Sequence, residues 1–141
     1  MEVPPVLFII FNRPDTTGRV FECIQEVKPK QLFIAGDGPR ENFASDLLNV
    51  QLTRQIVNRV NWDCELHTLF QATNLGCKKG PVAAIDWFFH NVDSGIILED
   101  DCLPHASFFP FCEELLEKYK DNEEVMMIGG NNYQVGRKRG N

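Results

Sequence analysis

Short apolar runs of strand length alternate along this sequence with amphipathic stretches of helix length. The expected strands are residues 6–11, 32–35, 65–70, 95–98 and 125–128. The expected helices are one opening at Pro14 with Asp15 as N-cap, residues 44–60, one opening at Pro81, and residues 108–119. Strands that are apolar throughout and separated by helices are typical of parallel sheets with crossover connections. The sequence therefore predicts one α/β domain over residues 1–141, with a mainly parallel sheet and helices on both faces.

Composition narrows the class of protein. The chain has 14 Lys and Arg residues and 20 Asp and Glu residues, which gives a formal net charge of −6. An acidic protein is an unfavourable partner for the nucleic-acid backbone, because neutralising phosphates needs a basic surface. No apolar segment has the length of a transmembrane helix. The five cysteines are scattered, with no Cys-x-x-Cys pair, which favours reduced thiols over a disulfide framework or a zinc site. We therefore expect a cytoplasmic protein without a transmembrane segment.

Polar or glycine-rich segments follow each expected strand. They are Asn12-Arg13-Pro14, Asp37-Gly38-Pro39, residues 74–80, Glu99-Asp100-Asp101 and residues 129–132. In open α/β sheets, ligands bind outside the carboxyl ends of the strands, where loops and helix N-termini meet. These segments are therefore the expected site.

Three consecutive carboxylates, Glu99-Asp100-Asp101, stand directly after an apolar strand. Left uncompensated they would repel one another, and a divalent cation would remove that penalty. Hard oxygen ligands suit Mg²⁺ or Mn²⁺. If the strand geometry persists, Glu99 and Asp101 point one way and Asp100 the other. The alternative is an exposed acidic turn that caps the next helix, but a position at the end of a core strand favours the metal.

Other polar residues at the same edge have both a binding and a structural interpretation. Asp37, between two glycines, can accept a hydrogen bond from a nucleotide base or can simply stabilise a turn. Arg13 can contact a base or phosphate through its planar donor fork or can be a surface arginine. Lys78 and Lys79, just before an expected helix start, suit a diphosphate, or they form a solvated pair. The residues alone leave these alternatives open.

Several common α/β functions are excluded by absent motifs. The first strand is not followed by Gly-x-Gly-x-x-Gly, which argues against a dinucleotide oxidoreductase. No Gly-Lys-Ser/Thr loop of an ATPase and no Gly-x-Ser-x-Gly elbow of a hydrolase occurs. The glycine-rich first loop of nucleotidylyltransferases is absent too, since Asn12-Arg13-Pro14 stands in its place.

The order of these segments resembles a known family. The segments are "VLFIIFNRP", "LFIAGDGPR", "NLGCKKGPVAAIDWFF", "GIILEDDCLPHASFFPFCEELLEKY" and "VMMIGGNNY". Together they are similar to GT-A-fold (Rossmann-like) glycosyltransferases, in particular the bacterial HlpA-like (hemolysin-type) sugar transferases and N-acetylglucosaminyltransferase I. The latter also has a Glu-Asp-Asp metal motif. The resemblance covers nearly the whole chain, and its most specific part is the block of strand, Glu-Asp-Asp and helix.

The resemblance implies a role for each residue of the acidic motif. Asp101 would bind the divalent metal, Mn²⁺ or Mg²⁺, that bridges the donor diphosphate. Asp100 and Glu99 would contact the ribose or the donor sugar, with the division between them open.

It also implies roles for the residues after the other strands. Asp37 matches the position that holds uracil, and Arg13 matches the first-loop position near the nucleotide. Lys78 or Lys79 matches a basic position near the phosphates, although the family often has Arg there.

The implied reaction is transfer of a sugar, with inversion, from a nucleoside diphosphate sugar, expected to be UDP-linked, to a hydroxyl of a glycan or lipid-linked saccharide. Family members continue into an acceptor-binding half that supplies the catalytic base. No residue up to Asn141 matches that base, so we expect an N-terminal fragment of a longer enzyme that binds donor but transfers little. The alternative is a non-catalytic nucleotide-sugar-binding module.

Overall fold

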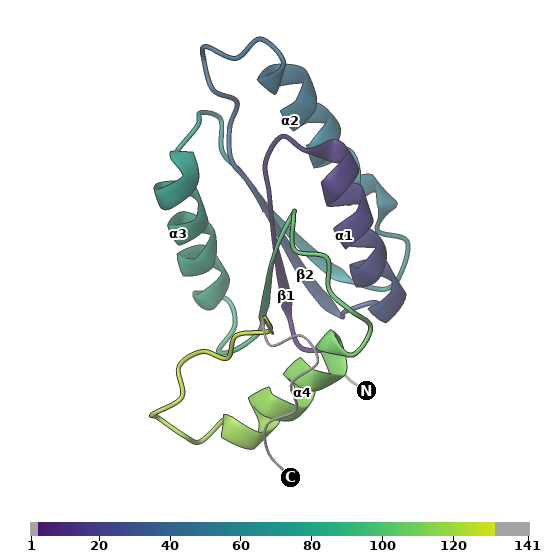
Figure 1. Cartoon of the computed structure of the whole chain (residues 1–141), viewed down its shortest axis with the longest axis vertical. Coiled ribbons are helices and arrows are strands. Elements are labelled where there is room, and N and C mark those ends of the chain that lie inside the picture. The colour runs from purple at the N-terminus through teal and green to yellow at the C-terminus, as the bar shows by residue number, and fades with distance from the viewer. Residues whose placement is uncertain (1–2, 132–141) are drawn as a thin grey trace.

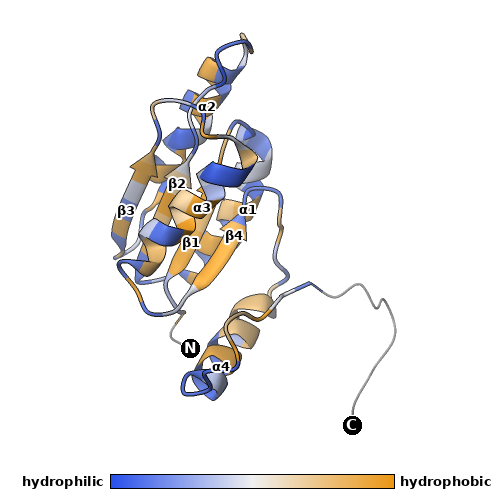
Figure 2. Cartoon of the chain, turned by 90° about the vertical axis from the view of Figure 1, so that its left-hand side faces the viewer, coloured by the Kyte–Doolittle hydropathy of each residue, from blue (hydrophilic) through white to orange (hydrophobic). Residues whose placement is uncertain are grey.

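The computed structural model describes residues 3–131. Its centre is a four-stranded sheet (Figure 1) in which all neighbouring strands are parallel. The strand order is β3-β2-β1-β4 (Figure 2). The strands are β1 (Val6–Ile10), β2 (Gln31–Gly36), β3 (Glu65–Phe70) and β4 (Ile96–Glu99). The predicted α/β class with a parallel sheet is confirmed.

Helices cover both faces of this sheet, as predicted (Figures 1 and 2). On one face lie α1 (Pro14–Val27) and α2 (Asp46–Arg54), which continues as the 3-10 helix η1 (Gln55–Arg59). On the other face lies α3 (Gly76–Phe89). Each crossover between parallel strands thus packs a helix against the sheet.

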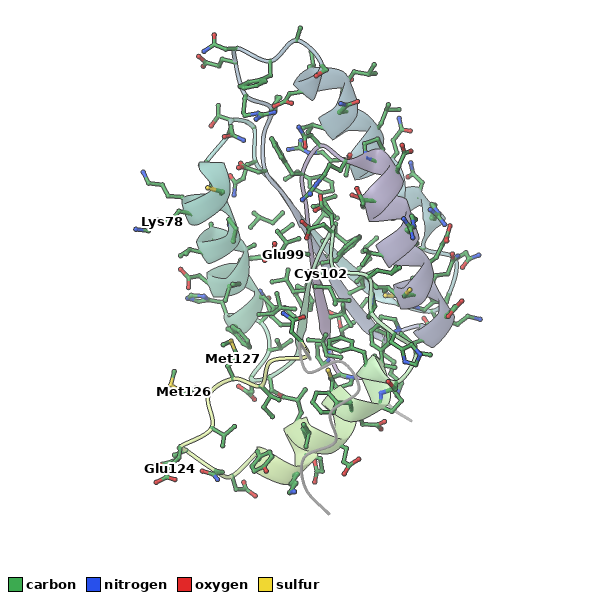
Figure 3. All side chains as sticks on the ribbon, in the orientation of Figure 1. Lys78, Glu99, Cys102, Glu124, Met126 and Met127 are labelled. Carbon is green, nitrogen blue, oxygen red and sulfur yellow. The ribbon has the colours of Figure 1, made fainter. Side chains whose placement is uncertain are left out.

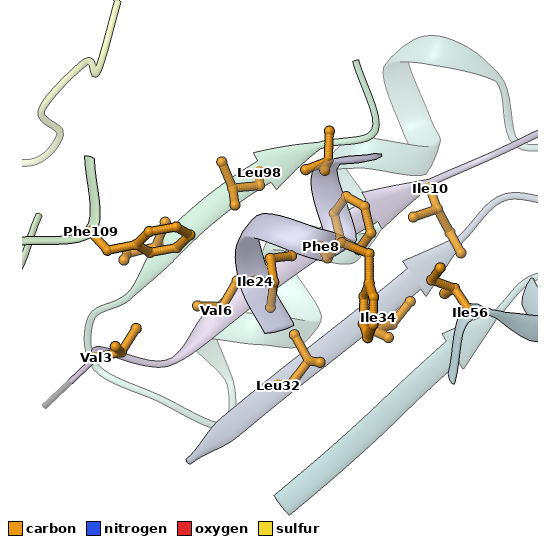
Figure 4. Packing of buried hydrophobic residues seen from close by; sticks show 13 residues of the cluster. Val3, Val6, Phe8, Ile10, Ile24, Leu32, Ile34, Ile56, Leu98 and Phe109 are labelled. Atoms are coloured by element: carbon orange, nitrogen blue, oxygen red, sulfur yellow. The ribbon is translucent and has the colours of Figure 1, made fainter. Parts of the chain in front are cut away.

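Alternation along β1 builds two separate cores. Val6, Phe8 and Ile10 pack toward α1 in one buried cluster, part of which is shown in Figure 4. Leu7, between them, packs with α3 in a second cluster on the opposite face. Burying each such side chain contributes about 1.5–3 kcal/mol. A strand buried on both faces must be apolar at every position, which is why this run was recognisable.

The last helix, α4 (Phe108–Tyr119), has the bounds that the sequence predicts. The chain turns back after β4, so α4 lies beyond the amino ends of the strands (Figure 1). Phe109 anchors it there in the cluster that also contains Val3 and Ile96. This leaves the carboxyl ends of the strands uncovered by α4.

Two expectations from composition concern cysteines and membranes. All five cysteines are free thiols. No helix among residues 3–131 combines the length and the apolar character needed to cross a membrane.

The predicted fifth strand is wrong. Residues 125–128 form no strand within the described chain, and Met126 and Met127 are 96% and 87% exposed. A strand needs a neighbour for its backbone hydrogen bonds, and this segment pairs with none of the four strands. An apolar, β-rich composition is therefore not sufficient at this position.

Helix starts also differ from the prediction. α1 begins at Pro14 with Arg13 as N-cap, so Asp15 lies in the first turn and is not the cap. α3 begins at Gly76, which places Pro81 inside the helix and not at its start. The expected helix over residues 44–60 is shorter, because its second half is the 3-10 helix η1.

Candidate functional site

A cavity of about 410 Å³ lies at the carboxyl ends of the strands. All four strands contribute residues at or just beyond their ends, and α3 contributes its first turns. The polar and flexible residues of the lining are Arg13, Gly36, Asp37, Arg40, Gln71, Asn74, Gly76, Cys77, Gly80, Glu99 and Asp100. The cavity therefore lies at the edge of the sheet where the sequence predicts a site.

The three carboxylates after β4 have different environments. Asp100 is buried, at 3% exposure, whereas its neighbours Glu99 and Asp101 are exposed. Glu99, the last residue of β4, lines the cavity together with Asp100 and lies near the middle of the molecule in Figure 3. Asp101 is not among the lining residues. The strand ends at Glu99, and Asp100 and Asp101 lie in a turn, so the expected alternation of a continuing strand does not apply to these two residues.

Arg13 joins the two aspartates. Its Nη2 donates to Asp100 Oδ1 at 2.6 Å and its Nη1 to Asp101 Oδ2 at 3.1 Å. The backbone N–H of Phe11 donates to Asp100 Oδ2 at 3.2 Å. The arginine thus offsets part of the repulsion between adjacent carboxylates that the sequence assigned to a cation.

The pKa values of this group reflect competition between burial and pairing. Burial raises the pKa of Asp100 above its ordinary value, against the opposing effect of Arg13. Burial alone would lower the pKa of Arg13, but Asp100 and Asp101 outweigh it and the pKa is raised. Asp100 is therefore a carboxylate held in a costly position, which is common in functional sites.

The described residues contain no group of three or more His, Cys, Asp or Glu side chains arranged to hold a metal ion. Asp100 and Asp101 are adjacent, and both are hydrogen-bonded to Arg13. A cation at this motif would share these carboxylates with the arginine.

Asp37, just after β2, is fully engaged by the protein. Its Oδ1 accepts from the N–H groups of Gly38 and Leu75, each at 2.8 Å. Its Oδ2 accepts from the N–H of Gly76 at 2.9 Å and from Asn74 Nδ2 at 3.1 Å. Four donors fill the acceptor sites of a carboxylate, so Asp37 caps the start of α3 from another element.

Lys78 and Lys79 do not line the cavity. Both are exposed on the first turns of α3, and Lys78 projects away from the sheet in Figure 3. Gly76, Cys77 and Gly80 of the same turns face the cavity. A phosphate there would meet the helix start before it met either lysine.

Arg40, which is partly exposed, forms an ion pair with the buried Asp46 that the sequence pattern did not indicate. Asp46 is 1% exposed and accepts from Arg40 Nε at 2.6 Å, from Arg40 Nη2 at 2.9 Å, and from the Arg40 N–H. Asn12 Nδ2, after β1, donates to the same carboxylate at 2.8 Å. The position of Arg40 directly after the Asp37-Gly38-Pro39 turn could have marked it as a site residue. Its partner Asp46 could not be identified in this way, because it lies in an expected helix.

Arg54 ties together the ends of two strands. Its Nη2 donates to the carbonyl of Asp37 at 3.0 Å and to that of Gln71 at 2.6 Å. Its guanidinium also lies 4.8 Å from the centre of the Phe70 ring. Arg54 therefore fixes the loops after β2 and β3 that line the cavity.

Asp46→Asn should lower the melting temperature at neutral pH by several degrees. Arg40 first, and Asn12 next, hold the pKa of Asp46 below its ordinary value. A lowered carboxyl pKa stabilises the fold above the unfolded-state pKa, about 3.9, and this stability is lost as pH falls through the folded-state pKa. Thermal melts from pH 7 to pH 2 should therefore show the difference between wild type and variant shrinking only below about pH 4.

Glu22→Gln provides the matched control, because Glu22 pairs with Arg59 at 3.4 Å in an exposed ion pair. Such pairs contribute little, so this variant should melt like wild type. Equal melting of Asp46→Asn and wild type at pH 7 would contradict a stabilising role for the pair of Arg40 with the buried Asp46.

Comparisons of the chain with protein-family models, with curated proteins and with solved structures find no match. The interpretation of this cavity therefore depends on its own geometry and charge and on the resemblance of the sequence segments.

Proposed function

We propose that this chain is the nucleotide-sugar-binding domain of a metal-dependent glycosyltransferase. The enzyme would transfer a sugar from a nucleoside diphosphate sugar, expected to be UDP-linked, to a hydroxyl of a glycan or lipid-linked saccharide. The observation that carries the proposal is the cavity of about 410 Å³ at the carboxyl ends of four parallel strands. Ligand pockets typically have about 300–1,000 Å³, and parallel α/β sheets bind nucleotides at this edge.

The charges in the cavity favour a cation-dependent ligand. Three carboxylates line it (Asp37, Glu99 and Asp100) against two arginines (Arg13 and Arg40), which leaves one net negative charge with all five ionised. Both arginines are also paired with aspartates outside the lining. This net negative charge would repel a diphosphate. A bound divalent cation would make the net charge positive and so attract it.

The acidic motif fits such a cation chemically. Mg²⁺ is usually held by one or two carboxylates together with substrate phosphates and waters, not by a cage of protein ligands. The exposed Asp101, next to the buried Asp100, therefore suits an ion that is completed by the diphosphate. A bound cation would offset the charge that develops on the leaving diphosphate.

The chain's own residues would position the donor. Asp100, fixed by Arg13 and the Phe11 N–H, presents a buried carboxylate at the cavity, where it can accept from ribose or sugar hydroxyls. Glu99 lies beside it on the same lining, and no hydrogen bond to its side-chain oxygens occurs within residues 3–131. We assign no catalytic base.

A non-catalytic nucleotide-sugar-binding module is the second candidate. It is favoured by the engagement of Asp37 and Asp100, whose carboxylates already accept protein hydrogen bonds. Hydrogen bonds within the protein thus hold both carboxylates in place, as a site that only binds its ligand requires. Both candidates require donor binding, and only the first requires turnover.

Calorimetric titration with UDP, GDP, CDP and their common sugar conjugates, each with and without Mn²⁺, tests the proposal. We expect UDP compounds to bind only with the metal. A parallel assay for release of UDP from UDP-sugars, with glycan acceptors present, separates transferase from binding module. Absence of any nucleotide binding at millimolar concentration would exclude both candidates.

A further inference from the structure

The Arg40 guanidinium is fixed in position at the cavity. Two of its N–H groups, on Nε and Nη2, bind the buried Asp46 carboxylate side by side, at 2.6 and 2.9 Å. Asn12 holds the same carboxylate from the loop after β1. An arginine held in this way loses little freedom when it binds a ligand, because its side chain is already ordered.

Two aromatic rings add to this arrangement. The Arg40 guanidinium lies 3.6 Å from the centre of the Phe43 ring and 5.5 Å from that of Phe11. Phe43 is 50% exposed, so it is not a core residue. Its ring stacks against the Arg40 guanidinium. Stacking on an aromatic face orients the plane of a guanidinium.

Arg40, which lines the cavity, retains free donors. A guanidinium has five N–H groups, and the two bound to Asp46 leave three, two of them on Nη1. None of these three makes a hydrogen bond within the described part of the chain, although Arg40 lines the cavity. Asp37, in contrast, accepts from four protein donors and has no acceptor site left for a ligand.

We propose that Arg40, oriented by Asp46 and Phe43, reads the nucleotide base and selects uracil over cytosine. This inference rests on the proposed nucleotide-sugar function and assigns the base recognition within that site. Arg40 can only donate, and its charge is compensated by Asp46, so the ion pair suits a neutral carbonyl acceptor better than a phosphate. Uracil presents a carbonyl, a hydrogen-bond acceptor, at the position where cytosine has an amino group. With cytosine, the amino donor would oppose the guanidinium donors of Arg40.

The test is the ratio of CDP to UDP dissociation constants, measured by calorimetry with Mn²⁺ on the whole chain. Wild type should prefer UDP by at least about tenfold, since an unpaired polar contact in a site discriminates strongly. In Arg40→Lys the ratio should fall to about twofold or less. Affinity for inorganic pyrophosphate with Mn²⁺ should change by less than about threefold, because pyrophosphate has no base.

Arg40→Lys keeps a cation beside Asp46 while removing the Nη1 donors. Phe43→Ala is a second variant that leaves the ion pair in place and removes only the stacking ring, and it should lower the ratio by a smaller factor. Arg59→Lys is the matched control: Arg59 also pairs with a carboxylate and stacks on an aromatic ring, Phe21, but does not line the cavity. It should keep the wild-type ratio.

Three outcomes would overturn the inference. An unchanged ratio in both Arg40→Lys and Phe43→Ala would show that Arg40 does not read the base. An equal loss of UDP, CDP and pyrophosphate binding in Arg40→Lys would show that Arg40 acts only through the loop structure. Failure of wild type to bind either nucleotide would defeat the proposed function itself, whereas UDP binding with an unaltered ratio would defeat only the role of Arg40.

Discussion

UDP binding should fall at least about a hundredfold when Mn²⁺ is chelated or when Asp101 is changed to asparagine. The reason is the excess of carboxylates over arginines in and around the cavity, which repels a diphosphate unless a cation is present. Residues that only orient metal ligands typically contribute 10–100-fold to affinity, so a ligand itself should contribute at least as much. Calorimetry with UDP, with and without EDTA, provides the measurement.

Asp101 is exposed and makes one side-chain ion pair, with Arg13, so its asparagine variant should fold like wild type. Asp93→Asn, at an exposed loop position away from the cavity, is the matched control and should bind UDP normally. If UDP binds equally well in EDTA, no metal bridge exists. If chelation abolishes binding but Asp101→Asn does not, the metal is held by Glu99 or Asp100.

Asp37→Ala should lower the free energy of unfolding by at least about 1.5–3 kcal/mol, the contribution of one hydrogen bond to a charged group. Four donors lose their acceptor in this variant, including the N–H groups of Leu75 and Gly76 at the start of α3. Because these residues hold the cavity wall, binding of UDP and of pyrophosphate should weaken together. Urea unfolding and calorimetry give the two quantities.

The control for Asp37→Ala is Asp63→Ala, at an exposed position in the loop before β3, where a change within about 0.5 kcal/mol is expected. Unaltered stability with a selective loss of UDP binding would favour the other interpretation. Asp37 would then contact the base directly, as the resemblance of its sequence segment implies.

The loop after β2 has no room for a side chain at Gly38. A Cβ on Gly38 would lie 2.4 Å from the backbone carbon of Thr73, a separation that the backbone must move to relieve. Gly38 is therefore required for the loop after β2 to lie against the loop after β3. Side chains from both loops, Asp37 and Asn74, meet there.

Four of the five expected strands and the helix order could be predicted because their causes are local. A parallel strand with both faces buried must be apolar along its length, as in residues 6–10, and α4 has an amphipathic pattern between clear boundaries. The edge of the sheet where the cavity lies also followed from the predicted parallel arrangement, since parallel strands present their carboxyl ends on one side.

The start of α3 could not be predicted, because its cap comes from another element. Asp37 accepts from the N–H groups of Leu75 and Gly76, 38 and 39 positions away, so the helix begins five residues before the proline that marked it in the sequence. Residues 125–128 show the reverse case. Their composition suits a strand, but a strand also depends on a partner, which the sequence pattern does not specify.

By itself, the sequence determined the α/β class, four of the strands and the polar segments that form the candidate site. Only the tertiary structure decided how those polar groups pair. Arg13 reaches Asp100 and Asp101 across 87 and 88 positions, and Arg40 reaches an aspartate that local pattern assigns to a helix. Apolar periodicity follows from neighbouring residues, whereas the charge compensation that fixes each polar side chain depends on which strand ends the fold brings together.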